Sequence, residues 1–123
     1  MSKYFQPSEF KCQCGRADCP APRVSDALLE RLDRVRMRVN HALYVTSGVR
    51  CEQHNTAVGG EQNSAHVIGV AADIRAESGT EKYALVVAAL AEGFRRIGVG
   101  KTFIHLDVSQ QHPQDVIWQY GSR

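Results

Sequence analysis

Two histidines and an aspartate offer metal-binding chemistry in the second half of the chain. His66 and Asp73 lie in Ser-Ala-His-Val-Ile-Gly-Val-Ala-Ala-Asp (residues 64–73), and His105 follows in Phe-Ile-His-Leu-Asp-Val (residues 103–108). Two imidazoles and one carboxylate suit a catalytic zinc, which takes three protein ligands and keeps a fourth position for water. We therefore regard His66, Asp73 and His105 as candidate metal ligands.

The residues around these ligands predict two strands that could bring them together. Residues 70–74 are mostly small or apolar and typical of a buried strand, in which the Asp73 carboxylate needs a cation or several donors. Residues 103–108 predict a second strand, whose side chains alternate between two faces. If the strands are neighbours, Asp73 and His105 share one surface, and His66 approaches from the preceding loop.

This pattern resembles the zinc D-alanyl-D-alanine carboxypeptidase family, which includes D-Ala-D-Ala dipeptidases, phage L-alanyl-D-glutamate endolysins and the hedgehog signalling domain. Every fixed position of the family's Ser-x-His-x-x-Gly-x-Ala-x-Asp segment is met, by Ser64, His66, Gly69, Ala71 and Asp73. The resemblance extends more loosely over residues 5–118. It implies that this segment supplies the first two zinc ligands and that His105 is the third.

The resemblance also indicates residues that would bind substrate. The run Thr-Ser-Gly-Val-Arg at residues 46–50 resembles the family's Ser-Gly-x-Arg segment, whose arginine meets a substrate carboxylate or polar group in the cleft. An arginine can hold a carboxylate with two parallel hydrogen bonds, which suits Arg50 to this role. The alternative for Arg50 is a solvated side chain or a structural ion pair. Ser64 could bond substrate or Asp73, or cap a turn.

The group that transfers the proton is not where the family has it. Its peptidases place a histidine or an acid two or three residues before the last zinc ligand, where this chain has Thr102 and Phe103. Asp107 is the nearest substitute, about 7 Å along the strand from His105. The favoured alternative is that Asp107 orients a ligand imidazole by accepting its free N–H. His112 is a second candidate for proton transfer because imidazole titrates near neutral pH.

Four cysteines form a second group of chemically capable side chains. Cys12, Cys14 and Cys19 lie within eight residues, and Cys51 is remote. Four thiolates could hold a structural zinc, but the single residue between Cys12 and Cys14 is tighter than the usual spacing of a zinc knuckle. Two disulfides also fit the count and would suit an oxidising space. Disulfides or partly free thiols are therefore favoured over a second zinc.

Length and charge fit one domain without nucleic-acid or membrane partners. The chain has 123 residues and a net charge of +2, with basic residues scattered among acids. No apolar stretch approaches the roughly twenty residues of a membrane span, and the N-terminus lacks a hydrophobic signal core. We therefore expect a monomer made in the cytoplasm that acts at the cell wall, as a phage or prophage enzyme would.

Apolar spacing predicts an α+β fold with two longer helices. One helix spans residues 25–40 with Ser25 or Asp26 as its cap, and another opens at the capping box of Ser78 and Glu81. The predicted apolar face of the second helix consists of Tyr83, Val86, Val87, Leu90 and Phe94. A short helix is expected within residues 50–58, and a helical turn begins at Pro7 in an irregular, cysteine-containing segment, residues 1–22.

Further strands are predicted at residues 43–47, 97–99 and 116–118. Together the elements predict a single domain, residues 1–123, in which a small, mainly antiparallel sheet carries the zinc site and the two longer helices pack on it. The function implied is a zinc metallopeptidase that cleaves peptidoglycan stem peptides, as a D,D-carboxypeptidase or an endopeptidase. The alternative is a zinc-containing module, inactive like hedgehog, that binds cell wall or a particle component.

Overall fold

A five-stranded sheet forms the centre of the fold in the computed structural model, which describes residues 2–121. The strands lie in the spatial order β1 (Val45–Ser47), β2 (Ala71–Arg75), β4 (Phe103–Asp107), β3 (Arg96–Val99) and β5 (Val116–Gln119). The pairings from β1 through β3 are antiparallel, and β5 joins β3 in parallel. The predicted α+β class with a mainly antiparallel sheet is confirmed.

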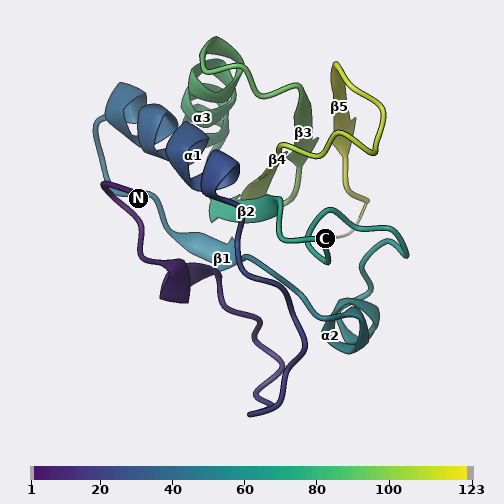
Figure 1. The fold of residues 1–123 in the computed structure, drawn as a ribbon. Coiled ribbons are helices and arrows are strands. Elements are labelled where there is room, and N and C mark those ends of the chain that lie inside the picture. The colour runs from purple at the N-terminus through teal and green to yellow at the C-terminus, as the bar shows by residue number, and fades with distance from the viewer. Residues whose placement is uncertain (1, 122–123) are drawn as a thin grey trace.

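Two longer helices, α1 (Asp26–Val39) and α3 (Gly79–Ala91), lie together on one side of the sheet, as Figure 1 shows. Each begins after a serine that the sequence indicated as its cap. Ser25 Oγ and Ser78 Oγ accept the backbone N–H three residues further on, at 3.4 and 3.0 Å. These bonds satisfy N–H groups that have no partner inside the helix, which fixes where both helices start.

Two short helical segments also lie where the sequence predicted them. The 3-10 helix η1 (Pro7–Phe10) begins at a proline, and α2 (Glu52–Ala57) follows β1, on the opposite side of the sheet from α1 and α3 (Figure 1). Residues 11–25 contain neither helix nor strand, in line with the irregular segment that was expected. Within the described part of the chain, no helix is both long and apolar enough to cross a bilayer.

The apolar face predicted for α3 is wrong in part. Tyr83, Val87 and Leu90 are 74%, 47% and 51% exposed, whereas Leu85, Ala88 and Ala89 are buried. The helix is apolar on most of its sides, so spacing alone could not select the buried one. Alanines allow α3 to lie close to α1, and the larger side chains are left outside. Phe94 is buried as expected, but it lies beyond the helix.

The sheet has two chemically different faces because successive side chains of a strand point to opposite sides. The face toward α1 and α3 is apolar and fully buried, with Ala72, Ile74, Ile97, Ile104 and Leu106. The other face carries buried polar side chains at the alternate positions of the same strands, namely Asp73, Arg96, His105 and Asp107. One face therefore supplies the core, and the other is available for chemistry.

The strand register brings two of the predicted ligands together on one face of the sheet, as the alternation of side chains along each strand predicted. Asp73 on β2 lies directly opposite His105 on β4, and Gly98 on β3 lies opposite His105 on its other side. Gly98 also pairs with Trp118 of β5. A Cβ on Gly98 would lie 2.7 Å from the Trp118 ring and 2.8 Å from the Tyr120 ring. The absent side chain thus leaves room for two aromatic rings beside His105.

We predict that Gly98→Ala displaces these rings. The added methyl group has no space, and overpacking of this kind costs about 1–3 kcal/mol. Trp118 is the single tryptophan of the chain, so its fluorescence emission reports the displacement directly, and chemical denaturation measures the loss of stability. Gly79→Ala is the matched control because a Cβ there meets nothing within 4 Å. Unchanged emission and stability in Gly98→Ala would contradict this packing.

Candidate metal centre

Three side-chain atoms meet on the polar face of the sheet. His66 Nε2 lies 3.2 Å from both Asp73 Oδ1 and His105 Nδ1, and the latter two atoms are 3.0 Å apart. All three residues are buried, with at most 6% of their surface exposed. The three residues that the sequence selected as ligands therefore form one compact group, which can bind a metal ion.

Backbone contacts fix His66 in its loop and select its tautomer. Its N–H donates to Ser64 Oγ at 3.1 Å, and its carbonyl accepts the Arg50 N–H at 3.0 Å. Ring atom Nδ1 lies 2.6 Å from the Gly48 carbonyl oxygen, which can only accept, so Nδ1 carries the proton. The lone pair of His66 is therefore on Nε2, the atom that faces Asp73 and His105.

Asp107 sets the tautomer of His105 in the same manner. Asp107 Oδ2 accepts from His105 Nε2 at 2.7 Å, which leaves Nδ1 as the lone-pair atom of the neutral ring. Asp107 is 1% exposed and also receives bonds from Arg96 Nε at 2.8 Å and from the Ser109 N–H at 3.0 Å. These contacts suit it to orienting the imidazole, the alternative favoured from sequence, because its oxygens are occupied.

The donor set fits a tetrahedral ion. In these tautomers, both imidazole lone pairs and a carboxylate oxygen face one another, an arrangement that is repulsive unless a cation or a proton lies between them. Ligands at about 2.0–2.2 Å from a tetrahedral zinc are separated by about 3.3–3.6 Å, slightly more than the separations of 3.0 and 3.2 Å found here. A zinc ion therefore matches this group in both donor type and spacing.

Burial and hydrogen bonding move the pKa values of the two imidazoles in opposite directions. Burial lowers the pKa of His66, so its ring stays neutral. Burial also opposes the charge on His105, but its bonds to Asp107 and Asp73 outweigh this and raise its pKa. The same bonds, from His105 and His66, hold the pKa of the Asp73 carboxyl well below its usual range despite burial. The metal-free site thus favours one proton, on His105.

Arg50 contacts the carboxylate that the sequence assigned to the metal. Its Nη2 lies 3.4 Å from Asp73 Oδ2, while Nε donates to Ser47 Oγ at 3.1 Å and Nη1 to Asn55 Oδ1 at 3.0 Å. Arg50 is 8% exposed, so its guanidinium orients Asp73 through a buried ion pair. The structure therefore shows that Arg50 contacts Asp73, and substrate binding by Arg50 stays a prediction.

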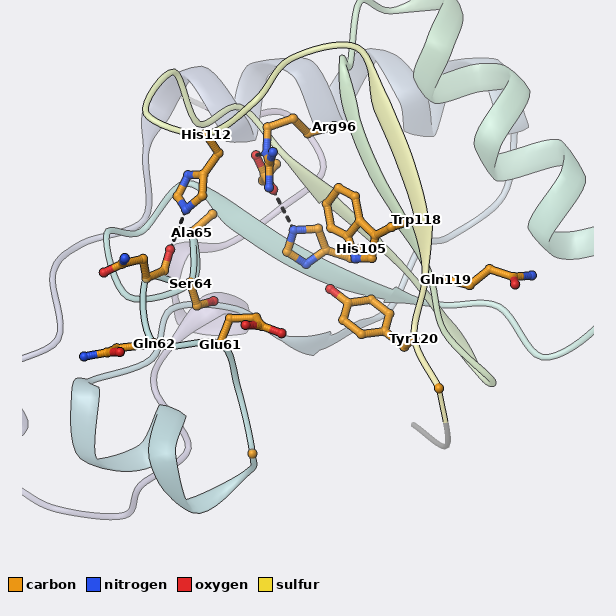
Figure 2. Close-up of a pocket in the computed structure, with 14 residues that line it drawn as sticks. Glu61, Gln62, Ser64, Ala65, Arg96, His105, His112, Trp118, Gln119 and Tyr120 are labelled. Atoms are coloured by element: carbon orange, nitrogen blue, oxygen red, sulfur yellow. Dashed lines mark hydrogen bonds and ion pairs between the residues drawn. The ribbon is translucent and has the colours of Figure 1, made fainter.

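Two adjoining cavities open beside the three ligands. The smaller, about 160 Å³, is lined by Arg50, Val58, Glu61, Ser64, His66, Asp73, Phe103 and Tyr120. The larger, about 560 Å³, shares Glu61, Ser64 and Tyr120 with it and also includes His105, His112 and Trp118. Figure 2 shows these side chains around the larger cavity, which we call the cleft. The candidate metal-binding group therefore lies beside a cleft large enough to admit a substrate.

His112 lies in the wall of the cleft, with both ring nitrogens in contact with protein atoms. Nε2 contacts the Asn63 carbonyl oxygen and must donate to it, while Nδ1 lies 2.6 Å from Ser109 Oγ. The ring therefore joins the loop after β4 to the loop before β2 (Figure 2). To accept a proton from substrate or water, His112 would first have to give up its bond with Ser109.

Sequence reasoning missed Glu61 and left Trp118 and Tyr120 unassigned. Figure 2 shows the polar ends of Glu61 and Tyr120 directed into the cleft from opposite walls. The ring centroids of Trp118 and Tyr120 lie 5.3 and 6.3 Å from that of His105, so both rings flank this ligand. The alternation of residues 116–120 could have indicated the aromatic wall, but nothing in the local pattern distinguishes Glu61 from other loop acids.

A buried His-Asp-His group in a cleft is an arrangement that metal-dependent hydrolases use. The family model described as Peptidase M15 matches residues 3–107, and the chain belongs to this family. The resemblance inferred from the segment around His66 is thereby confirmed, and membership identifies the protein as a metallopeptidase of a zinc-dependent family. A search of curated proteins finds no match.

We predict opposite pH dependences for the stability of the metal-free protein and for its zinc affinity. The raised pKa of His105 gives stability that is complete below the ordinary imidazole value of about 6.5 and is lost as pH rises through the raised value. Zinc needs the neutral ring, so its affinity rises over that same interval. His66 and Asp73 titrate lower, because their pKa values are lowered.

Thermal unfolding in chelator from about pH 6 to 9, beside zinc titrations, measures both trends. His105→Gln is the control because it cannot carry the proton, and its metal-free stability should lack this step. An identical pH profile in the variant and the natural chain would contradict the prediction.

The hydrogen bond from His105 to Asp107 gives a separate prediction. Asp107→Asn keeps the shape but removes the charge that supports the imidazole, so zinc affinity should fall about 10- to 100-fold. Competition with a fluorescent chelator measures the affinity. Glu77→Gln is the control because this exposed carboxylate contacts Arg75. Unchanged affinity in Asp107→Asn, with a large loss of turnover, would instead favour proton transfer by Asp107.

Proposed function

We propose that this protein is a zinc-dependent peptidase that cleaves the stem peptides of peptidoglycan, as a D,D-carboxypeptidase or an endopeptidase. The observation that carries the proposal is the convergence of His66 Nε2, Asp73 Oδ1 and His105 Nδ1 within 3.2 Å of one another beside an open cleft. Membership of the M15 peptidases supports hydrolysis of a peptide bond. The preference for cell-wall peptides comes from the family resemblance.

The three ligands would hold zinc with one coordination position left open, which is the arrangement of catalytic sites. Zinc bound there would polarise the scissile carbonyl and lower the pKa of a coordinated water. Asp107 keeps the His105 lone pair directed at Asp73 and His66, where the ion would lie, and Arg50 restrains the far oxygen of Asp73. Asp107 lines the larger cavity and Arg50 the smaller one, so both supporting side chains lie in the walls of the proposed site.

Arg50 and Ser64 are proposed to face substrate as well. Both line the smaller cavity together with His66 and Asp73, next to the place where a scissile peptide would lie. A guanidinium at the floor of this cavity would attract a substrate carboxylate, including the terminal one that a carboxypeptidase recognises. Trp118 and Tyr120 add an apolar wall, against which a small side chain such as that of D-alanine would pack.

For the proton-accepting group we propose Glu61. It contributes the carboxylate that lines both cavities, and its side chain points into the cleft (Figure 2). A carboxylate oxygen there can accept the proton of the attacking water and return it to the leaving amine. Asp107 is occupied by three donors and His112 by two contacts, so Glu61 serves better than either residue indicated by the sequence.

A binding module without turnover is the second candidate. Its support is Phe103, which stands where relatives of this family carry the base and whose ring packs 5.3 Å from that of Tyr120. An aromatic ring cannot accept a proton, so catalysis would depend entirely on a group from elsewhere in the cleft. In this case, the chain would hold zinc and cell-wall peptides but release no product.

Incubation of the zinc-loaded protein with purified muropeptides, followed by mass spectrometry, tests the proposal. We expect loss of D-alanine or cleavage within the stem, and Glu61→Gln should lower turnover by about 10²- to 10⁴-fold with zinc retained. Glu77→Gln, remote from the cleft, should match the natural chain. Binding of muropeptides without product over a wide pH range would establish the binding module. Full activity in Glu61→Gln would show that another group accepts the proton.

A further inference from the structure

The four cysteines form a second cluster, away from the cleft. Their sulfur atoms all lie within 4.8 Å of one another, although Cys51 is far from the other three in sequence. Cys12, Cys14 and Cys19 come from the irregular segment, and Cys51 is the residue that precedes α2. All four are free thiols in this structure. The fold has therefore brought together four soft ligands that sequence spacing alone did not connect.

Polar contacts around the cluster suit thiolates. Cys51 Sγ accepts the His54 N–H at 3.3 Å and lies 3.7 Å from Arg16 Nη2, and Cys12 Sγ accepts the Cys51 N–H at 3.3 Å. Cys14 Sγ accepts the Arg16 N–H at 3.4 Å. Donors directed at sulfur stabilise its charged form and orient it, as the outer contacts of metal sites do.

We propose that Cys12, Cys14, Cys19 and Cys51 bind a structural zinc ion, separate from the catalytic site. Four thiolates close the tetrahedral shell and leave no position for substrate, which is the property of a structural site. Sulfurs bound at about 2.3 Å from a tetrahedral zinc are about 3.8 Å apart, and the four sulfurs here all lie within 4.8 Å of one another. The arginine guanidinium beside Cys51 offsets part of the negative charge of a tetrathiolate centre.

The short spacing that argued against this site is accommodated by the local backbone. Gly15 has φ +78°, a left-handed conformation that glycine adopts without strain, and it turns the chain directly after Cys14. The cluster takes its fourth ligand from Cys51, the residue before α2, instead of from a second nearby cysteine pair. The usual knuckle spacing describes two ligand pairs, each close in sequence, whereas this cluster combines three cysteines of one segment with a single distant one.

Such a site would order a segment that has no regular secondary structure. Residues 11–25 have no helix or strand, and a metal joining three of their side chains to the start of α2 replaces that missing framework. Cys51 follows Arg50 directly, and Asn55 of α2 bonds the Arg50 guanidinium. The second zinc would therefore also maintain the position of Arg50 behind Asp73.

Metal content of protein purified under reducing conditions tests the proposal. We expect two zinc ions per natural chain, one in Cys14→Ser, and one in the double variant His66→Ala, His105→Ala, which loses only the catalytic ion. This pair separates the two sites, so failure of the proposed catalytic zinc leaves the cysteine result readable. One ion in the natural chain, together with an unchanged count in Cys14→Ser, would overturn the proposal.

Cobalt replacement gives a readout that does not depend on a cysteine variant folding. Bound at four thiolates, Co²⁺ should show thiolate-to-metal charge-transfer absorption and the intense visible bands of a tetrahedral ion, and these should persist in the double histidine variant. The thiols of the zinc-loaded natural chain should also resist alkylation until chelator is added. Absence of the charge-transfer bands, rapid alkylation of all four thiols, or a disulfide-linked peptide in the unreduced digest would each overturn the site.

Discussion

The bond between Asp107 and His105 is the interaction on which the site depends. It lies at 2.7 Å between two buried side chains of one strand, and it decides which imidazole nitrogen carries a lone pair toward Asp73 and His66. Removal of one partner from a buried pair of this kind is expected to cost about 3–5 kcal/mol. Arg96 and the Ser109 N–H also donate hydrogen bonds to the Asp107 carboxylate, so Asp107 stays charged although it is buried.

The two different faces of the sheet allow a small domain to hold both an apolar core and a buried polar site. Core residues and ligands alternate along β2 and β4, so the same hydrogen-bonded ladder supports the apolar layer beneath α1 and α3 and the polar layer beneath the cleft. A shift of the β2–β4 register by one residue would exchange these faces. The apolar layer therefore fixes the separation of Asp73 and His105 as firmly as their own contacts do.

Much of the fold and the candidate ligand set could be predicted from the sequence because both rest on local patterns. Ser25 and Ser78 are helix caps, and residues 71–75 and 103–107 alternate as strands must. The buried face of α3 could not be predicted, since a helix that is apolar nearly all round has no preferred side until α1 is in place.

The sequence by itself determined which residues are the candidate ligands: the spacing of His66 and Asp73, and the placement of His105 on a predicted strand, restrict which atoms can meet. Only the tertiary structure decided which lone pair of His66 faces inward, because the Gly48 carbonyl reaches its ring from a distant part of the chain. Only the tertiary structure placed Glu61 in the cleft, because no local pattern distinguishes this loop acid from others. Only the tertiary structure likewise brought Cys51 to the other three cysteines, which are distant from it in sequence.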